Sequence, residues 1–249
     1  AVIVMVAIGK GSQHEVMSVI AKMGENLLTI NAGEMKRRGG RLRLSGNVNT
    51  LNLRDVNYLS NEVDGIAFVA PFEIKEMKVK YLQVLTSTNV AGSTLEFLET
   101  RNYRITSGEM FSEMDQKLGA RVAVVGKTVI KNMLGGGDPL GKTVRINAIP
   151  FRIIGVFESK GLDSDGIDQD EILLIPIKSM LRRILNQSHI STIYVKADSR
   201  RNIERVAAKI KTELRDRHKI ADDAENDFTI VSQIDLENLK AETSELFTR

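Results

Sequence analysis

The residues whose spacing most resembles a chemical site are 136–143, GGDPLGKT, which match the phosphate-binding pattern G-x-x-x-x-G-K-[ST]. That pattern binds phosphate where a strand leads into the loop and a helix follows, because backbone N–H groups and the helix N-terminus then face the anion. Here residues 127–134 have a helical pattern, and residues 144–146 read as a strand. Pro139 also removes one N–H group from the loop. The sequence therefore favours a turn between a helix and a hairpin, with a nucleotide-binding enzyme as the alternative.

A second glycine–lysine–threonine triplet, residues 126–128, does lie between a strand pattern at 122–125 and a helical pattern. Arg121, however, occupies the position at which the phosphate-binding pattern requires its first glycine. The triplet is therefore predicted to be the start of a helix.

Residues 163–170, DSDGIDQD, resemble a calcium-binding loop. An EF-hand loop requires an oxygen-bearing side chain at its third alternating position, with glycine directly after it. Ile167 occupies that third position and Gly166 precedes it, so the register does not fit. The acids predict a solvated loop, and weak cation binding is the alternative.

The strongest run of charge is the basic segment 36–43, KRRGGRLR. An RNA-binding segment would interleave aromatic residues for base stacking, and none is present. The net charge of +3 is also too small to indicate a polyanion partner, so nucleic acid is not expected. The run predicts a solvated loop or an exposed hairpin, and any binding role would involve an acidic protein surface or lipid headgroups.

Cysteine is absent, which excludes a thiol nucleophile, a disulfide framework and a thiolate metal site. The three histidines, His14, His189 and His218, are scattered without ligand spacing. No Ser/His/Asp set or carboxylate pair is placed on one face by its spacing. The sequence thus predicts no catalytic, cofactor-binding or metal-binding residues, and no cofactor.

The elements that would position any site form two similar units at the two ends of the chain. In the first, residues 26–32 read as a strand, and a capping box at 52–55 opens a helix with Val56, Leu59 and Val63 on one face. Residues 66–76 then read as a long strand.

In the second unit, residues 191–197 alternate like a strand and Ser199 or Asp198 is predicted to cap a helix. That helix carries an apolar stripe, and residues 227–232 follow it as a strand. The stripe consists of Ile203, Val206, Ala207, Ile210 and Leu214. Two such strand–helix–strand units can join into one split β-α-β sheet of ferredoxin-like type.

The middle of the chain, from Val79 to about Leu185, has short strands, brief helices and many glycines. A capping box at 93–96 predicts a short helix ending near Arg101, and residues 143–146 and 151–158 predict a hairpin. Residues 171–175 read as a strand, after which Pro176 opens a helix. The last of these helices carries Ile177, Met180, Leu181, Ile184 and Leu185.

The predicted fold class is α+β, a porter-like split β-α-β subdomain with a smaller β-rich subdomain inserted into it. The first subdomain is discontinuous, comprising residues 1–78 and 188–249, and the insertion comprises residues 79–187. Residues 1–8, AVIVMVAI, are continuously apolar, too short to cross a bilayer, and are expected to be the end of a membrane segment. Helices at 12–23 and 235–249 are expected to lead towards the membrane.

Several segments, in order, resemble the MacB-like periplasmic core domain of ABC transporter permeases, the MacB/FtsX-type mechanotransmission family. The most specific match combines residues 121–126 with 138–146 and 151–156. Glu109 departs from the family pattern, which usually has Arg there, so any role of that Arg is in doubt. Other matching segments are 1–16, 64–71, 90–97, 107–111, 171–176, 214–218 and 227–230.

The resemblance implies a non-enzymatic domain on the periplasmic, extracytoplasmic face of a bacterial inner membrane, anchored by transmembrane helices. It implies as partners a cognate ABC ATPase domain or subunit, a second permease in a homodimer or heterodimer, and a periplasmic adaptor protein. Rigid-body motion driven from the terminal helices, 12–23 and 235–249, would couple ATP hydrolysis to substrate export or release. A stand-alone periplasmic adaptor or lipid-handling module is a further alternative.

Overall fold

The computed structural model describes residues 26–38, 41–45, 49–163 and 166–232. The apolar segment 1–8 and the predicted helices at 12–23 and 235–249 lie outside these residues. Within the described part of the chain, no helix combines the length and the apolar character needed to cross a bilayer.

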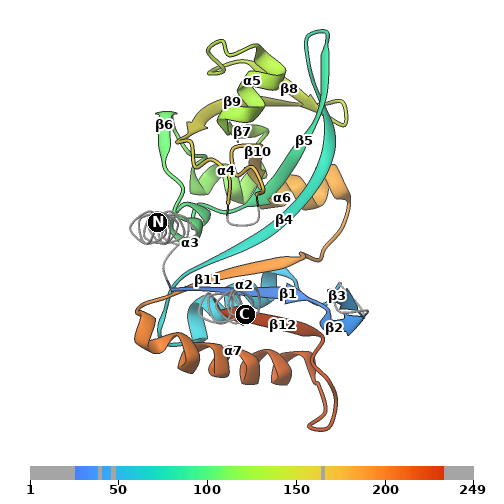
Figure 1. The fold of residues 1–249 in the computed structure, drawn as a ribbon, viewed down its shortest axis with the longest axis vertical. Helices are drawn as coiled ribbons and strands as arrows, with labels where there is room; N and C mark the ends of the chain where they lie inside the picture. The colour runs from blue at the N-terminus through green and yellow to red at the C-terminus, as the bar shows by residue number, and fades with distance from the viewer. Residues whose placement is uncertain (1–25, 39–40, 46–48, 164–165, 233–249) are drawn as a thin grey trace, which may run out of the picture.

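The first and last parts of the described chain form a four-stranded antiparallel sheet (Figure 1). Its strands lie in the order β12-β1-β11-β4, with each neighbouring pair antiparallel. This is the arrangement of a split β-α-β sheet, and it confirms the predicted fold class. The elements are β1 (Leu27–Ala32), α2 (Leu53–Glu62), β4 (Ile66–Tyr81), β11 (Thr192–Ala197), α7 (Ile203–His218) and β12 (Phe228–Ser232).

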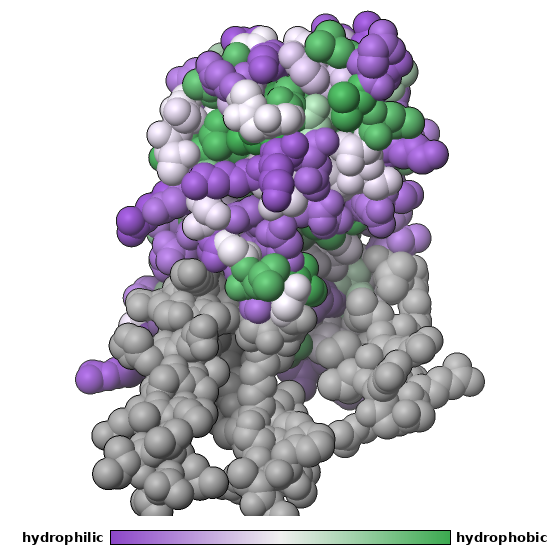
Figure 2. Space-filling model, turned by 45° about the horizontal axis from the view of Figure 1, so that its top comes forward, coloured by the Kyte–Doolittle hydropathy of each residue, from purple (hydrophilic) through white to green (hydrophobic). Residues whose placement is uncertain are grey.

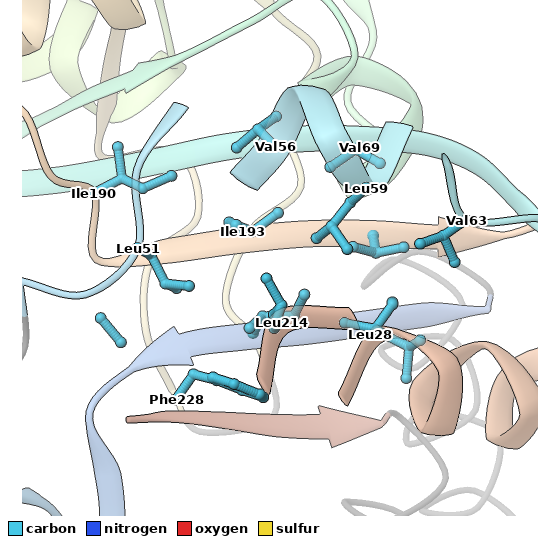
Figure 3. Close-up of a cluster of buried hydrophobic side chains, with 14 of the residues drawn as sticks. Leu28, Leu51, Val56, Leu59, Val63, Val69, Ile190, Ile193, Leu214 and Phe228 are labelled. Atoms are coloured by element: carbon cyan, nitrogen blue, oxygen red, sulfur yellow. The ribbon is translucent and has the colours of Figure 1, made fainter. Parts of the chain in front are cut away.

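Helices α2 and α7 contribute to one hydrophobic core, called here the lower core, on one face of this sheet (Figure 3). The capping box of α2 is confirmed, because the Asn52 side chain accepts from the backbone of the helix and Asp55 accepts from the Asn52 backbone. It starts the helix in the register that buries Val56, Leu59 and Val63. They pack with apolar side chains from all four strands and from α7, among them Leu28, Val69, Ile193, Leu214 and Phe228.

The predicted cap of α7 is wrong. A 3₁₀ turn, η2 (Arg200–Asn202), precedes the helix, so that Asn202 rather than Ser199 or Asp198 is the N-cap residue. The Oδ1 of Asp198 accepts a hydrogen bond of 2.8 Å from Nδ2 of Asn202, so its side chain contacts the N-cap residue. Asn202 itself makes no side-chain cap hydrogen bond.

The middle of the chain continues the same sheet through the order β4-β5-β10-β7-β9-β6, and β8 pairs with both β4 and β9. Its strands are β5 (Val84–Ser93), β6 (Ile105–Gly108), β7 (Val122–Val125), β8 (Thr143–Ile146), β9 (Ile149–Phe157) and β10 (Ile172–Pro176). Its helices are α3 (Phe97–Arg101), α4 (Glu113–Leu118), α5 (Lys127–Leu134) and α6 (Ile177–Ser179). The predicted hairpin is confirmed as β8 and β9.

Successive side chains of these strands point to opposite faces of the sheet and contribute to two separate cores. In β7, Ala123 and Val125 face the core beneath α5, whereas Val122 and Val124 belong to the core that contains Phe97 of α3. The second of these cores is aromatic: the rings of Phe97 and Tyr103 lie 5.1 Å apart. Both faces are therefore buried, which explains the continuously apolar sequence of β7.

The predicted capping box at 93–96 is wrong, although the helix does end at Arg101. Ser93 is fully buried at the end of β5, and its hydroxyl donates to the backbone oxygen of Pro71 at 2.6 Å. Ser93 is thus the last residue of β5, and α3 begins only at Phe97, too far along the chain for Ser93 to be its N-cap residue. The N-cap residue is Glu96, which makes no side-chain cap hydrogen bond.

The helix predicted after Pro176 begins as α6 and continues as a π-helical turn, η1 (Met180–Leu185). Met180 packs against Gly92 of β5, where an added Cβ would lie only 2.4 Å from the Met180 Cβ. A glycine at this position lets the helix approach the strand closely.

Strand β4 is longer than the predicted strand 66–76 and belongs to both halves of the sheet. Its residues 66–72 pair with β11, and its residues 73–81 pair with β5. We propose that two subdomains divide the chain, with their first junction where β4 changes partners, between residues 72 and 73 rather than at the predicted 78–79. Near this junction the ring of Phe72 lies 5.1 Å from that of Tyr194 in β11 and 5.6 Å from that of Phe97.

The basic segment 36–43 lies in a two-stranded hairpin formed by β2 (Glu34–Arg38) and β3 (Arg41–Ser45). Of the two forms that the sequence allows, a loop or a hairpin, the structure shows the hairpin. It is a sheet separate from the ten-stranded one.

Candidate functional site: the strand ends and the polar network beside them

The phosphate-binding pattern at 136–143 falls in the predicted setting, after helix α5 and before strand β8. Lys142, which would bind phosphate in that pattern, lies instead with its Nζ 5.6 Å from the centre of the Tyr81 ring. The triplet at 126–128 is the start of α5, as predicted, with Gly126 as its N-cap residue. Neither segment has the strand, loop and helix of a nucleotide-binding loop in the required register.

The acidic segment 163–170 uses its carboxylates to hold the loop between β9 and β10. Asp168 Oδ2 accepts a hydrogen bond of 2.7 Å from the Thr128 hydroxyl. Asp170 is buried and accepts from the backbone N–H groups of Lys160 and Gly161, at 2.7 and 3.2 Å. Among the residues that the structure describes, no group of three or more acids and histidines is arranged to hold a metal ion.

A buried cation beside this loop was missed by sequence analysis. Lys160 is 7% exposed, and its Nζ donates to the backbone oxygen of Arg101 at 2.7 Å while lying 4.5 Å from the Tyr103 ring centre. Burial raises the pKa of Tyr103 to about 12, so the phenol is neutral. The cluster joins α3 to the loop after β9, and a structural role accounts for it.

The two ends of the split β-α-β sheet lie side by side. Leu28, near the start of β1, pairs with Ser232, the last residue of β12, and the two strands are antiparallel. The N-terminal segment therefore enters the described fold next to the point at which the C-terminal segment leaves it. A displacement of either segment would act on the same pair of neighbouring strands.

A polar network beside these strands joins α2, α7 and the start of β12. Asp55 of α2 is 2% exposed, and its Oδ1 accepts hydrogen bonds of 3.2 Å from Nε and Nη2 of Arg217. His218, the last residue of α7, has its Nδ1 2.8 Å from Asp227 Oδ1 and its Nε2 3.5 Å from Asp55 Oδ2. The longer separation is a close charge pair rather than a good hydrogen bond.

The network perturbs the protonation of two of its members. Interaction with Asp55 raises the pKa of His218, and the carboxylate of Asp227 adds to this against the opposing effect of burial. Burial by itself would raise the pKa of Asp55, but the close charge pair with His218 and the hydrogen bond from the Asn52 backbone outweigh it and lower that pKa. Both shifts favour the charged pair in the folded protein relative to the unfolded chain.

A second contact reinforces the same helix pair. The Tyr58 hydroxyl of α2 donates to Glu213 Oε2 of α7 at 2.5 Å, and the Arg217 guanidinium lies 4.3 Å from the Tyr58 ring centre. No spacing or periodicity in the sequence pairs α2 with the end of α7. Residues 214–218 belong to the family resemblance, which does not connect them to α2.

A cleft of about 340 Å³ separates α2 from α4 and α6, between the two proposed subdomains. Its lining combines the buried side chains of Val56, Val69 and Ile177 with polar groups from both sides. Asn57 and Ser60 face it from α2, and Gln116, Lys117 and Lys178 face it from α4 and α6.

Comparison with known proteins places these features in a family. The sequence model of the MacB-like periplasmic core domain matches residues 1–213. The chain is 31% identical over 247 residues to a macrolide export ATP-binding/permease protein MacB of Marinobacter nauticus, and 28% identical over 246 residues to that of Bdellovibrio bacteriovorus. These alignments cover 99% and 98% of the chain but only 37% and 38% of the relatives, so the chain spans little more than a third of their length.

Two solved structures share the fold. The periplasmic region of MacB from Actinobacillus actinomycetemcomitans has a TM-score of 0.74 at 24% identity, covering 91% of this chain and 98% of that one. The extracellular domain of the ABC-type transporter YknZ from Gram-positive bacteria has a TM-score of 0.66 at 20% identity, covering 83% and 100%. At these identities the two structures establish the fold alone.

Proposed function

Because the chain belongs to the family of MacB-like periplasmic core domains of ABC transporter permeases, we propose that it couples ATP hydrolysis by a separate domain or subunit to substrate export or release. The domain itself performs no chemistry in this proposal. Membrane helices on both sides would anchor it to the extracytoplasmic face of the bacterial inner membrane. The greater length of the relatives supports this arrangement.

The observation that carries the proposal is the adjacency of the start of β1 and the end of β12. Motion delivered by flanking membrane helices would enter through these two neighbouring strands. From there it would pass through β11 into β4, which continues into the second half of the sheet. Such a rigid, hydrogen-bonded path suits a rotation or hinge mechanism.

The polar network strengthens the same input region. It connects α2, α7 and β12 by interactions between charged groups, which are stronger than neutral hydrogen bonds. We propose that these contacts make the split β-α-β subdomain move as one body. The cleft between α2 and α4 is then the place where its movement relative to the second subdomain takes effect.

The proposed partners are the cognate ATPase, a second permease in a homodimer or heterodimer, and a periplasmic adaptor protein. The names of the relatives, macrolide export ATP-binding/permease proteins, support an ATPase partner and an exported substrate. We propose no nucleic-acid partner.

The experiment restrains the cleft in the full-length transporter. This chain has no cysteine, so in a transporter whose remaining residues carry none either, the pair Asn57→Cys and Lys117→Cys can be joined specifically across the cleft by a flexible bis-maleimide. We expect cross-linking to abolish export while ATP hydrolysis continues. The matched control, Asn57→Cys with Ser60→Cys, places both thiols on α2 and should leave export unchanged after the same treatment.

Undiminished export after complete cross-linking between α2 and α4 would contradict the coupling mechanism. The nucleotide-binding alternative is tested separately, by titrating the chain with ATP and magnesium. Tight binding that is lost in Lys142→Gln would instead support an enzyme that uses residues 136–143.

A further inference from the structure

A cavity of about 510 Å³ lies beside α5, outside the strand ends, the polar network and the cleft described above. Helix α5 packs over β4, β5 and β10, and residues of β6 and β9 line one side of the cavity together with α5. The turn at 136–139 after α5 closes the other side. The volume lies in the range of about 300–1,000 Å³ that is typical of small-molecule pockets.

The bottom of this cavity is apolar. Ile130 of α5, Val156 of β9 and Pro139 of the turn line it, and all three are buried. Ser107 of β6 pairs directly with Val156, so its side chain lies on the same face of the sheet as α5. The Thr106 hydroxyl, also in the lining, donates to the Val156 backbone oxygen at 3.4 Å.

The rim of the cavity is basic. Lys127 and Lys131 lie four residues apart on α5, so both ammonium groups project from one side of the helix. Within the described residues, neither lysine has an ion-pair partner. Asp138 is the one acid in the lining, and its Oδ1 accepts from the Leu140 N–H at 3.1 Å, which closes the turn. The lining therefore carries two positive charges and one negative charge.

We propose that this cavity binds an anionic amphiphile, a molecule in which a carboxylate or phosphate is joined to an apolar chain or ring. Lys127 and Lys131 would hold the anion at the rim, and Ile130 and Val156 would contact the apolar part. Charge-assisted hydrogen bonds to two ammonium groups favour an anion over a neutral headgroup. Residues 136–139 thus contribute to a site without forming a nucleotide-binding loop.

The surface around this site has the same mixed character. Figure 2, turned so that the top of Figure 1 comes forward, shows hydrophobic and hydrophilic side chains interspersed over this end of the molecule. A ligand that is both charged and apolar matches such a surface better than a purely polar one. The inference does not rest on the proposed transport function, because it uses only the cavity and its lining.

The test is calorimetric titration of the chain with decyl phosphate and decanoate below their micelle concentrations. We expect binding of both, at least about tenfold weaker in the double variant Lys127→Gln, Lys131→Gln. The matched control Lys117→Gln, Lys178→Gln removes two lysines from the other cleft and should change the affinity less than twofold. Because Lys127 and Lys131 are exposed, the double variant should fold normally, which an unchanged urea midpoint would establish.

A second variant tests the apolar part independently of charge. Ser107→Trp should fill the cavity and weaken decyl phosphate binding about tenfold with both lysines present. Binding of decyltrimethylammonium or of inorganic phosphate with the same affinity as decyl phosphate would overturn the proposal. A cationic headgroup does not require the two lysine ammonium groups, and inorganic phosphate does not require the apolar floor. Equal binding by the wild type and the double lysine variant would overturn it as well.

An anionic group joined to an apolar chain occurs both in membrane lipids and in soluble ligands. Sedimentation with phosphatidylglycerol vesicles distinguishes these two sources. Retention on vesicles that is lost in the double variant supports a lipid ligand. Binding of decyl phosphate without retention on vesicles supports a soluble one. Absence of both overturns the proposal.

Discussion

At the residue scale, the contacts of Asp55 matter most, because one carboxylate serves two functions. Its Oδ2 accepts from the Asn52 backbone and completes the capping box of α2, while its Oδ1 pairs with Arg217 at the end of α7. Local helix formation and long-range packing therefore depend on the same side chain. Arg217 and His218 would both lose a partner if it were removed.

We predict that Asp55→Ala lowers the free energy of unfolding by about 3 kcal/mol, because removing one member of a buried pair leaves its partners uncompensated. Urea denaturation followed by circular dichroism measures this. The control is Asp64→Ala, which removes a carboxylate whose side chain is 95% exposed and paired only with Lys209. It should change stability by less than about 1 kcal/mol, and equal losses in both variants would contradict the role of the network.

The raised pKa of His218 predicts a pH dependence. Protonated His218 is favoured in the folded state, so its contribution is complete below the unfolded value of 6.5 and is lost as pH rises through the folded pKa. For Asp55 the folded pKa is lowered, so its contribution is present above 3.8 and is lost as pH falls through the folded value. Stability should therefore decline on both sides of a maximum that lies between these two values.

Urea midpoints measured from pH 5.5 to 9 check the alkaline side. In His218→Gln the decline above pH 6.5 should flatten. An unchanged decline in His218→Gln would show that another group titrates.

At the scale of elements, the turn between β8 and β9 determines how two paired strands meet. Its residues Asn147 and Ala148 both have positive φ, 48° and 68°. Two such residues form the hairpin turn whose twist matches that of its strands, and the second position favours glycine. Alanine in this conformation is strained, because its Cβ approaches the following carbonyl oxygen.

We predict that Ala148→Gly stabilises the protein by about 0.5 kcal/mol, because relief of this strain exceeds the entropy that glycine adds to the unfolded chain. Thermal unfolding is the measurement. Ala67→Gly makes the same change at an exposed residue of β4 without positive φ, and it should destabilise instead. The same sign for both substitutions would contradict the strain at Ala148.

At the scale of the whole molecule, the two proposed halves share one sheet, and Ile177 and Leu181 of the second half pack into the core of the first. Strand β4 runs from one half into the other. Near the residue at which it does so, Phe72 lies between Tyr194 of one half and Phe97 of the other. Ser191 adds a backbone hydrogen bond of 2.6 Å to Oε2 of Glu73. These contacts predict that both halves unfold together.

The chain has no tryptophan, so Ile230→Trp and Ile149→Trp supply one clean fluorescence probe for each half. We expect coincident urea midpoints for the two probes, and separated midpoints once Phe72→Ala is added, at a cost of about 3 kcal/mol. Phe151→Ala, which removes a ring from the core beneath α5, should cost a similar amount while the midpoints stay together. Coincident midpoints in Phe72→Ala would mean that Phe72 does not couple the halves.

Features that depend only on neighbouring residues can be predicted from the amino-acid sequence alone. The capping box of α2, the apolar faces of α2 and α7, the β8–β9 hairpin and the helix start at Gly126 follow from local spacing, and all are present in the structure. The order of short motifs along the chain also identified the family. These features are readable because a helix or hairpin makes its hydrogen bonds within a few residues of itself.

Contacts between residues that are far apart in the sequence become visible only in the tertiary structure. Asp55 and Arg217 are 162 positions apart, and no periodicity links them. The capping box at 93–96 fails because Ser93 is the end of strand β5, where its hydroxyl donates to Pro71, 22 residues earlier, and α3 begins only at Phe97. The cavity between Lys127, Lys131 and Val156 likewise forms only where α5, the turn after it and strands β6 and β9 come together. Such contacts depend on how whole elements pack, and local patterns do not encode that.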